Sequence, residues 1–347
     1  MMDGAHPIGE ERLARLMTKG TEFLGSKYAI LGGAMTWVSE NNLVSAISEA
    51  GGFGVIAAGG MPIDRLRSEI EQTREKTKNP FGVNLITLRP DLMDLIELCG
   101  ELQVSHIVLA GGLPPAGAIA RIKEFGAKLM VFAPTAALAR KLVRSGADAI
   151  IVEGSEAGGH IGPVSTSVLA QEILPVVENV PVFVAGGIGR GDLIAAYLEM
   201  GAAGAQLGTR FVVAEESVAH ENFKKAFIRA NARDAIASVQ IDPRFPVIPV
   251  RALKNKASED FMAYQQEMIT AYQNGDVPLE EAQLKIEHFW GGALRAAVVD
   301  GDVENGSIMA GQSVGMVKTI QSTKAIVDEL VEQAAVALRR RSGPDDH

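Results

Sequence analysis

Short apolar runs rich in β-branched residues recur at regular intervals through the first two thirds of the chain. Stretches with helical periodicity separate them, for example residues 42–49, 63–74 and 135–143. Apolar strands that alternate with helices predict a parallel sheet covered on both faces. The predicted strands are residues 29–31, 53–56, 81–85, 106–109, 128–132, 149–152, 182–185 and 204–207.

Eight strand–helix units of about 25 residues each are the number that a closed barrel requires. We therefore predict an α/β fold, a (β/α)8 TIM barrel over residues 21–214. An open doubly wound sheet is the alternative, although it rarely contains eight consecutive units. We expect residues 215–300 to form a smaller helical subdomain near the barrel mouth. Residues 301–341 are expected to form a glycine-rich loop followed by a closing helix. Residues 1–20 and 342–347 are expected to be flexible ends.

Glycine-rich segments follow several of the predicted strands. In a barrel the loops after the strands carry the chemistry, and the loops after strands seven and eight often bind phosphate. Gly186 and Gly187 follow the seventh predicted strand, and Gly208 and Thr209 follow the eighth. Tight turns alone would explain one such glycine pair. Two on adjacent strands favour a phosphate site, which a nucleotide, a flavin or a sugar phosphate would fill equally well.

The loop after the sixth predicted strand, residues 153–162, places two carboxylates and one imidazole among glycines. Glycine lets a backbone approach a flat ligand closely. An imidazole exchanges protons near neutral pH, so His160 is the predicted catalytic residue. Glu153 and Glu156 are candidates for a general acid and base, with the alternative that one of them orients the loop backbone.

Composition narrows the range of partners. The 347 residues are 47% hydrophobic and 22% charged, with a formal net charge of -9. Nucleic acids and anionic membranes attract basic surfaces, so neither is an expected partner. Cys99 is the single cysteine and is expected to be buried and inert. No histidines have metal-ligand spacing, so we predict no metal. The chain shows neither a signal peptide nor an apolar span, which predicts a cytoplasmic protein.

The chain resembles the FMN-dependent barrel family that contains nitronate monooxygenases (2-nitropropane dioxygenases) and the flavin-type enoyl-acyl-carrier-protein reductase. The resemblance covers nearly the whole chain. It rests on Gly33-Ala34-Met35-Thr36-Trp37, Phe81-Gly82-Val83-Asn84, Glu156-Ala157-Gly158-Gly159-His160, Ala185-Gly186-Gly187-Ile188 and Gln206-Leu207-Gly208-Thr209-Arg210-Phe211. The family often has Gln-Gly-Gly-Met where this chain has Gly32-Gly33-Ala34-Met35, so one amide that could touch the flavin is missing.

The resemblance implies that FMN lies across the barrel mouth. Its phosphate would contact the backbone after strands seven and eight, its ring system would contact the first loop and Asn84, and His160 would face the substrate. The C-terminal loop with Gln312 would border the flavin. The predicted cofactor contacts are Gly33, Ala34, Met35, Asn84, Glu153, Gly158, Gly159, Gly186, Gly187, Gln206, Gly208, Thr209 and Gln312.

The predicted function is therefore that of an FMN-dependent oxidoreductase, foremost a nitronate monooxygenase that converts alkyl nitronates and O2 to carbonyl compounds and nitrite. The alternative is an NAD(P)H-dependent enoyl-acyl-carrier-protein reductase, or a quinone reductase, with the same FMN site. The Met309-Ala310-Gly311-Gln312 loop resembles that second branch. A non-catalytic flavin-binding module is a third, weaker reading. The sequence leaves NAD(P)H use and a homodimer open.

Overall fold

A computed structural model describes residues 6–245 and 248–341 of the chain. Eight parallel strands form a TIM barrel, in which neighbours in sequence pair side by side. Backbone hydrogen bonds on both sides of Phe53 close the ring, because its N–H donates to Ile30 and its carbonyl accepts from Gly32, both at 2.9 Å. The barrel strands are β1 (Ile30–Gly32), β2 (Gly54–Ala57), β3 (Phe81–Ile86), β4 (His106–Ala110), β5 (Lys128–Phe132), β6 (Ala149–Glu153), β8 (Val182–Ala185) and β9 (Gly204–Leu207).

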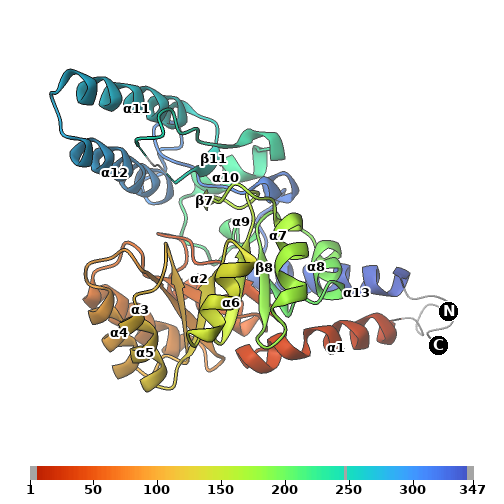
Figure 1. Cartoon of the computed structure of the whole chain (residues 1–347). Coiled ribbons are helices and arrows are strands. Elements are labelled where there is room, and N and C mark those ends of the chain that lie inside the picture. The colour runs from red at the N-terminus through yellow and green to blue at the C-terminus, as the bar shows by residue number, and fades with distance from the viewer. Residues whose placement is uncertain (1–5, 246–247, 342–347) are drawn as a thin grey trace.

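Helices surround the barrel strands (Figure 1). They are α2 (Asn41–Glu49), α3 (Ile63–Lys76), α4 (Leu92–Glu101), α5 (Ala116–Glu124), α6 (Ala136–Arg144), α7 (Thr166–Ile173), α8 (Gly191–Glu199) and α9 (Thr209–Val212). The helix after β9 is only four residues long. The last helix, α13 (Thr323–Arg341), packs against both α8 and α2 and so covers this part of the wall. The predicted barrel is confirmed, and the open sheet is excluded.

Local sequence explains these elements. The barrel strands are almost wholly buried because both of their faces are covered, which is why they lack polar alternation. Helix α6 begins after Thr135, whose hydroxyl accepts a hydrogen bond from the backbone N–H of Leu138 at 3.2 Å. One side of α6 is buried through Ala139 and Leu142. The boundaries of β5, β8 and β9 match the sequence prediction to the residue.

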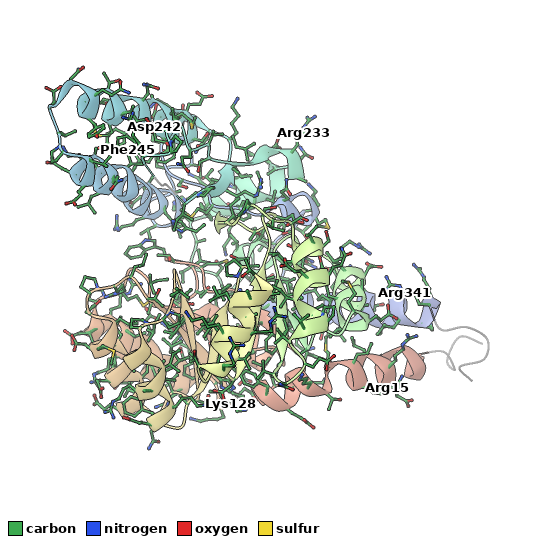
Figure 2. The ribbon with its side chains drawn as sticks, in the orientation of Figure 1. Arg15, Lys128, Arg233, Asp242, Phe245 and Arg341 are labelled. Carbon is green, nitrogen blue, oxygen red and sulfur yellow. The ribbon has the colours of Figure 1, made fainter. Side chains whose placement is uncertain are left out.

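A second, smaller hydrophobic cluster lies above the barrel. It is formed around α11 (Lys256–Asn274) and α12 (Leu279–Val298), and its buried members include Phe245, Phe261 and Ile286. Figure 2 shows Phe245 between the two helices. Gly275 ends α11 with a left-handed backbone, φ +81°, which reverses the chain into α12. The helices expected in residues 257–299 are thus present, while the domain boundaries at 214 and 300 stay a prediction.

The subdomain also contains strands that the sequence analysis did not predict. Strands β10 (Ala235–Ala237) and β11 (Val250–Leu253) pair antiparallel, and β11 also pairs with β7 (Gly159–His160). This three-stranded sheet joins the subdomain to the predicted catalytic loop. Short helix α10 (Glu221–Arg229) links the barrel to this region.

The N-terminal region differs from the expectation. Residues 1–20 were expected to be flexible, but α1 (His6–Leu24) packs along α13 with Leu13 and Met17 buried. Leu13, Leu16, Met17 and Leu24 recur at helical spacing, so the signal for this helix was present in the sequence. The predicted flexible tail, residues 342–347, and residues 1–5 lie outside the described part of the chain.

Candidate active site at the barrel mouth

The glycine-rich loops at the mouth lie against one another in a continuous arc. The backbone N–H of Gly33, after β1, donates to the carbonyl of Leu207 at 2.8 Å. On the next loop, a Cβ placed on Gly208 would lie 3.4 Å from the Met35 sulfur. The Thr209 hydroxyl then accepts from the N–H of Gly311 at 3.0 Å. The structure therefore brings the first loop, the loop after β9 and the C-terminal loop together.

The arc continues through the loop after β6. The N–H of Gln312 donates to the carbonyl of Glu156 at 2.9 Å, so the C-terminal loop runs directly along this segment. A Cβ on Gly158 would lie 2.6 Å from the backbone nitrogen of Gly311. Gly158 is therefore required by this backbone contact, a reason that differs from the flat-ligand argument made from the sequence. Its neighbour Gly159 is needed for its left-handed backbone, φ +79°.

The turn after β8 has left-handed backbone at both glycines. The φ angles are +95° at Gly186 and +71° at Gly187. A Cβ on Gly187 would lie 2.9 Å from the Cβ of Glu156, and one on Gly186 would lie 2.9 Å from the Thr166 hydroxyl. Only glycine satisfies the conformation and the space here without strain. This turn and the segment Gly208–Thr209 are on adjacent strands, as the phosphate hypothesis requires.

Glu156 has a structural role. Its Oε2 accepts hydrogen bonds from the backbone N–H of Thr166 at 2.8 Å and from the Thr166 hydroxyl at 2.9 Å. A carboxylate at this position satisfies the free N–H groups at the start of α7 and interacts favourably with the helix dipole. This supports the alternative in which one of the two carboxylates orients the loop.

Arg251 on β11 holds the His160 loop to the subdomain. Its Nε donates to the carbonyl of Ser155 at 2.8 Å, and its Nη1 donates to the carbonyl of Ala235 at 2.6 Å. Burial lowers the pKa of Arg251, while the Glu156 carboxylate opposes the shift. The Arg251 guanidinium thus has two backbone carbonyls as its partners.

His160 itself is exposed at the mouth. Its strand β7 pairs with β11 through the register of His160 with Val250, and the next N–H, that of Ile161, donates to Pro249 at 2.9 Å. The backbone on both sides of the imidazole is thus fixed by the subdomain sheet. Sequence reasoning located this histidine but missed the strand pairing, because a two-residue strand leaves no periodic signal.

Three polar side chains near the ends of barrel strands form no hydrogen bond with any described residue. They are Asn84 on β3, Glu153 on β6 and Gln206 on β9. Asn84 and Gln206 are 5% and 7% exposed. Glu153 and Gln206 are both in register with Ala185, so they project from the same side of the barrel wall, about 10 Å apart. Burial raises the pKa of Glu153 to about 7.

Other candidates lie away from the mouth. His106 is buried at the start of β4, with Nε2 2.9 Å from the carbonyl of Phe23, and burial lowers its pKa to about 4. It is a core residue. Cys99 is buried, as expected, and this burial raises the pKa of its thiol to about 12. The Nδ1 of His220 accepts from the N–H of Asn222 at the start of α10. The side chains of His288 and Trp290 are outside the description.

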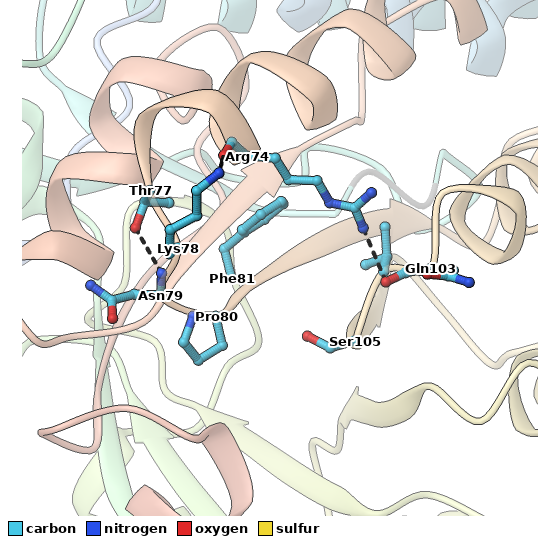
Figure 3. A pocket seen from close by; sticks show the side chains of 9 residues that line it. Arg74, Thr77, Lys78, Asn79, Pro80, Phe81, Gln103 and Ser105 are labelled. Carbon is cyan, nitrogen blue, oxygen red and sulfur yellow. Dashed lines mark hydrogen bonds between the residues drawn. The ribbon is translucent and has the colours of Figure 1, made fainter.

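A surface cavity of about 280 Å³ lies at the opposite end of the strands, beside the starts of β3 and β4. Figure 3 shows protein partners for the polar side chains of Arg74, Thr77 and Lys78. Arg74 donates to the carbonyl of Gln103 at 3.0 Å, and the Thr77 hydroxyl accepts from the N–H of Asn79 at 3.0 Å. The mouth, where polar groups lack partners, is therefore the better candidate site.

Residues 6–245 and 248–341 contain no cluster of three or more potential metal ligands. In the same part of the chain, no helix combines the length and apolar character needed to cross a bilayer.

Comparison with known proteins places the chain in a family. The family model described as nitronate monooxygenase matches residues 18–333. A (3aS,4S,5R,7aS)-5-hydroxy-7a-methyl-1-oxo-octahydro-1H-indene-4-carboxyl-CoA dehydrogenase of Mycobacterium tuberculosis is 32% identical, over 94% of this chain and 99% of that protein. The structure of FabK from Thermotoga maritima is 37% identical with a TM-score of 0.82, covering 92% of this chain and 96% of that one.

A nitroalkane oxidase from Streptomyces ansochromogenes is 27% identical with a TM-score of 0.75, over 93% of this chain and 99% of that one. The family match spans most of the chain and agrees with the barrel and with the motifs at its mouth. The chain is an oxidoreductase and belongs to the nitronate monooxygenase family, whose members generally depend on a flavin.

Proposed function

We propose that the protein is an FMN-dependent oxidoreductase that acts on acyl thioesters. The proposal that the protein binds FMN rests on the polar side chains at the mouth that have no protein partner. These are Asn84, Glu153 and Gln206. Buried polar groups are normally hydrogen-bonded, so three unpartnered ones on one rim point to a ligand. An isoalloxazine offers several hydrogen-bond donors and acceptors and fits such a rim.

The phosphate end of FMN would contact the turns after β8 and β9, next to Glu153 and Gln206. There the backbone of Gly186, Gly187, Gly208 and Thr209 turns without side chains in the way, and the two turns lie on adjacent strands. Backbone N–H groups in such turns bind phosphate well. Gly33 and Met35 of the first loop lie beside Gly208. The loops after β1, β6, β8 and β9 that carry most of the predicted cofactor residues thus lie against one another.

The bound flavin would accept or supply hydride. The chain's own residues would do the rest. His160, exposed and held by β11, would exchange a proton at the α-carbon of the thioester, whose carbonyl makes that position acidic. Arg251 and Glu156 would hold the loop that carries His160. Glu153, with a pKa near 7, would gain or lose a proton according to the charge of the bound flavin ring.

The proposal that the substrate is an acyl thioester rests on one relative and on two exposed leucines at the mouth. The 32% identical relative is named as a carboxyl-CoA dehydrogenase. On the loops after β3 and β4, Leu88 and Leu113 are 71% and 61% exposed. Large apolar side chains held in water at a mouth are suited to contact an apolar acyl group.

Nitronate oxidation, which the sequence analysis placed first, is the second candidate. The nitroalkane oxidase structure and the family model favour it. The nitronate would occupy the same rim beside His160, and O2 would be the electron acceptor. Such a substrate is small and needs neither the apolar rim nor a nucleotide.

Anaerobic rapid mixing of the flavin-loaded protein separates these functions. The flavin absorbance would be followed after mixing with an acyl-CoA, NADH, NADPH or an alkyl nitronate. Our proposal predicts bleaching by a saturated acyl-CoA, or bleaching by a pyridine nucleotide followed by reoxidation with an enoyl-CoA. Bleaching by nitronate together with no response to any thioester, in either direction, would transfer the assignment to nitronate oxidation.

A further inference from the structure

An indole and two guanidinium groups meet at the rim of the barrel. The guanidinium carbon of Arg65, on α3, lies 5.3 Å from the centre of the Trp37 ring, and that of Arg295, on α12, lies 5.9 Å from it. We call Trp37, Arg65 and Arg295 the tryptophan cluster. Both distances are within the range of a cation–π contact. The cluster joins the barrel to the subdomain, since one arginine comes from each.

The cluster lies on the route to the predicted flavin. Trp37 is two residues beyond Met35, whose sulfur is beside Gly208. Arg65 is at the start of α3, on the helix end that follows β2 and therefore faces the mouth. The backbone of Trp37 is left-handed, with φ +68°. For a bulky residue this conformation costs about 1–2 kcal/mol relative to the usual one and is typical of functional positions.

Both arginines have hydrogen-bond donors to spare. Arg65 contacts Glu69 through Nε at 3.5 Å, and Arg295 contacts Asp300 through Nη1 at 3.0 Å. These are the hydrogen-bonding contacts that the two guanidiniums form with described residues, and each group carries five N–H donors. Their side chains are 42% and 51% exposed, so the remaining donors face solvent at the mouth.

Two arginines beside one ring are unusual in a chain with a negative net charge. The protein has a formal net charge of -9 and would repel an anion at long range. Two positive groups on one aromatic ring also repel each other, and a bound anion would remove that repulsion. The indole adds a flat surface on which a nucleobase can stack. Guanidinium groups form bidentate hydrogen bonds with phosphate.

We propose that the tryptophan cluster binds the phosphorylated adenosine of a nucleotide co-substrate. Arg65 and Arg295 leave the indole to bind its phosphates, and Trp37 then stacks on its adenine. Coenzyme A and NADPH both carry an adenosine with an additional ribose phosphate, and this shared part is what the cluster recognises. The inference rests on the proposed function, because it places the reactive end of the same molecule at the flavin while its nucleotide end stays at the rim.

The test is isothermal titration of the FMN-loaded protein with adenosine 3′,5′-bisphosphate and adenosine 2′,5′-bisphosphate, which represent coenzyme A and NADPH. The variants are Arg65→Gln, Arg295→Gln and their double variant. Arg67→Gln and Lys285→Gln are matched controls, because they remove an exposed, ion-paired cation from the same two helices. Each cluster variant should raise the Kd about 5- to 10-fold, and the controls less than about 2-fold.

A second measurement identifies the stacking ring. In a Trp290→Phe background Trp37 is the one tryptophan left, and its fluorescence should be quenched as either bisphosphate binds. The bisphosphate that binds more tightly identifies the source of the nucleotide. Pantetheine, which lacks adenosine, should give no quenching.

The outcomes separate this inference from the proposed function. Binding that is unchanged in the double variant, or a bisphosphate that does not bind at all, overturns the cluster even if thioesters exchange electrons with the flavin. Cluster-dependent binding without any electron exchange by thioesters supports the cluster and removes the proposed function. If the cluster only holds the subdomain against the barrel, the variants will change stability and leave the bisphosphate affinity unaltered. That outcome also overturns the inference.

Discussion

The Nε of Arg251 lies 2.8 Å from the backbone oxygen of Ser155, and this hydrogen bond fastens the His160 loop to the subdomain. The same guanidinium binds Ala235, so a single side chain joins β10, β11 and the loop. The position of the predicted catalytic imidazole therefore depends on the subdomain.

Arg251→Met keeps the length of the side chain and removes its donors. Two carbonyls would lose their partner, which should reduce the free energy of unfolding by about 1–3 kcal/mol. Turnover should fall about 10-fold or more with FMN still bound, because the variant loosens the His160 loop and leaves the cofactor contacts in place. Arg244→Met, which removes an exposed ion pair with Asp242, is the control. Normal turnover by Arg251→Met would show that the loop needs no such tether.

Glu153 should make stability depend on pH. Burial raises its pKa from the ordinary 4.5 to about 7, so the folded protein binds more protons than the unfolded chain between these pH values. The free energy of unfolding of the flavin-free protein should then fall as pH rises from about 4.5 to 7, by at most about 3 kcal/mol. Glu153→Gln should lack this decrease. Denaturant unfolding at pH 5 and pH 8 measures it, and equal pH dependence of both proteins would refute the assignment.

Asn84→Ala should weaken the binding of FMN without lowering the stability of the protein. The Asn84 amide forms no hydrogen bond with a described residue, so its removal leaves no protein group unpaired. We expect the Kd for FMN to rise about 10-fold with the melting temperature of the flavin-free protein unchanged. Asn41→Ala is the opposite control, since Asn41 Nδ2 donates to the buried Glu69 at 2.7 Å. It should lose stability and keep its FMN affinity.

Gly187→Ala should disturb the phosphate end of the site. The added Cβ would meet the Cβ of Glu156 at 2.9 Å on a backbone with φ +71°. The Kd for FMN should rise at least about 10-fold. In Gly201→Ala the φ is +101° but no atom lies within 4 Å, so that variant carries the backbone strain alone. It should lose about 1–2 kcal/mol of stability and bind FMN normally. Equal FMN affinity in both variants would argue against the phosphate turn.

The barrel was predictable because its strands are continuous apolar runs at regular spacing. The glycine turns after β8 and β9 and the His160 loop were found from position and residue type. The strands of the subdomain were not, since β7 and β10 are two and three residues long and obtain their partners from distant segments. The roles of Arg251 and Thr166 were missed for the same reason. Their partners, Ser155 and Glu156, are not neighbours in sequence, so only tertiary structure reveals the contacts.

Titration of the flavin-free protein with FMN and with riboflavin tests the central claim most directly. Quenching of flavin fluorescence gives the affinity of each. If the mouth binds FMN through Gly186, Gly187, Gly208 and Thr209, the loss of the phosphate should weaken binding about 100-fold. FMN binding far more tightly than riboflavin is the predicted result. Equal affinity for the two, or no binding of either, would contradict the site.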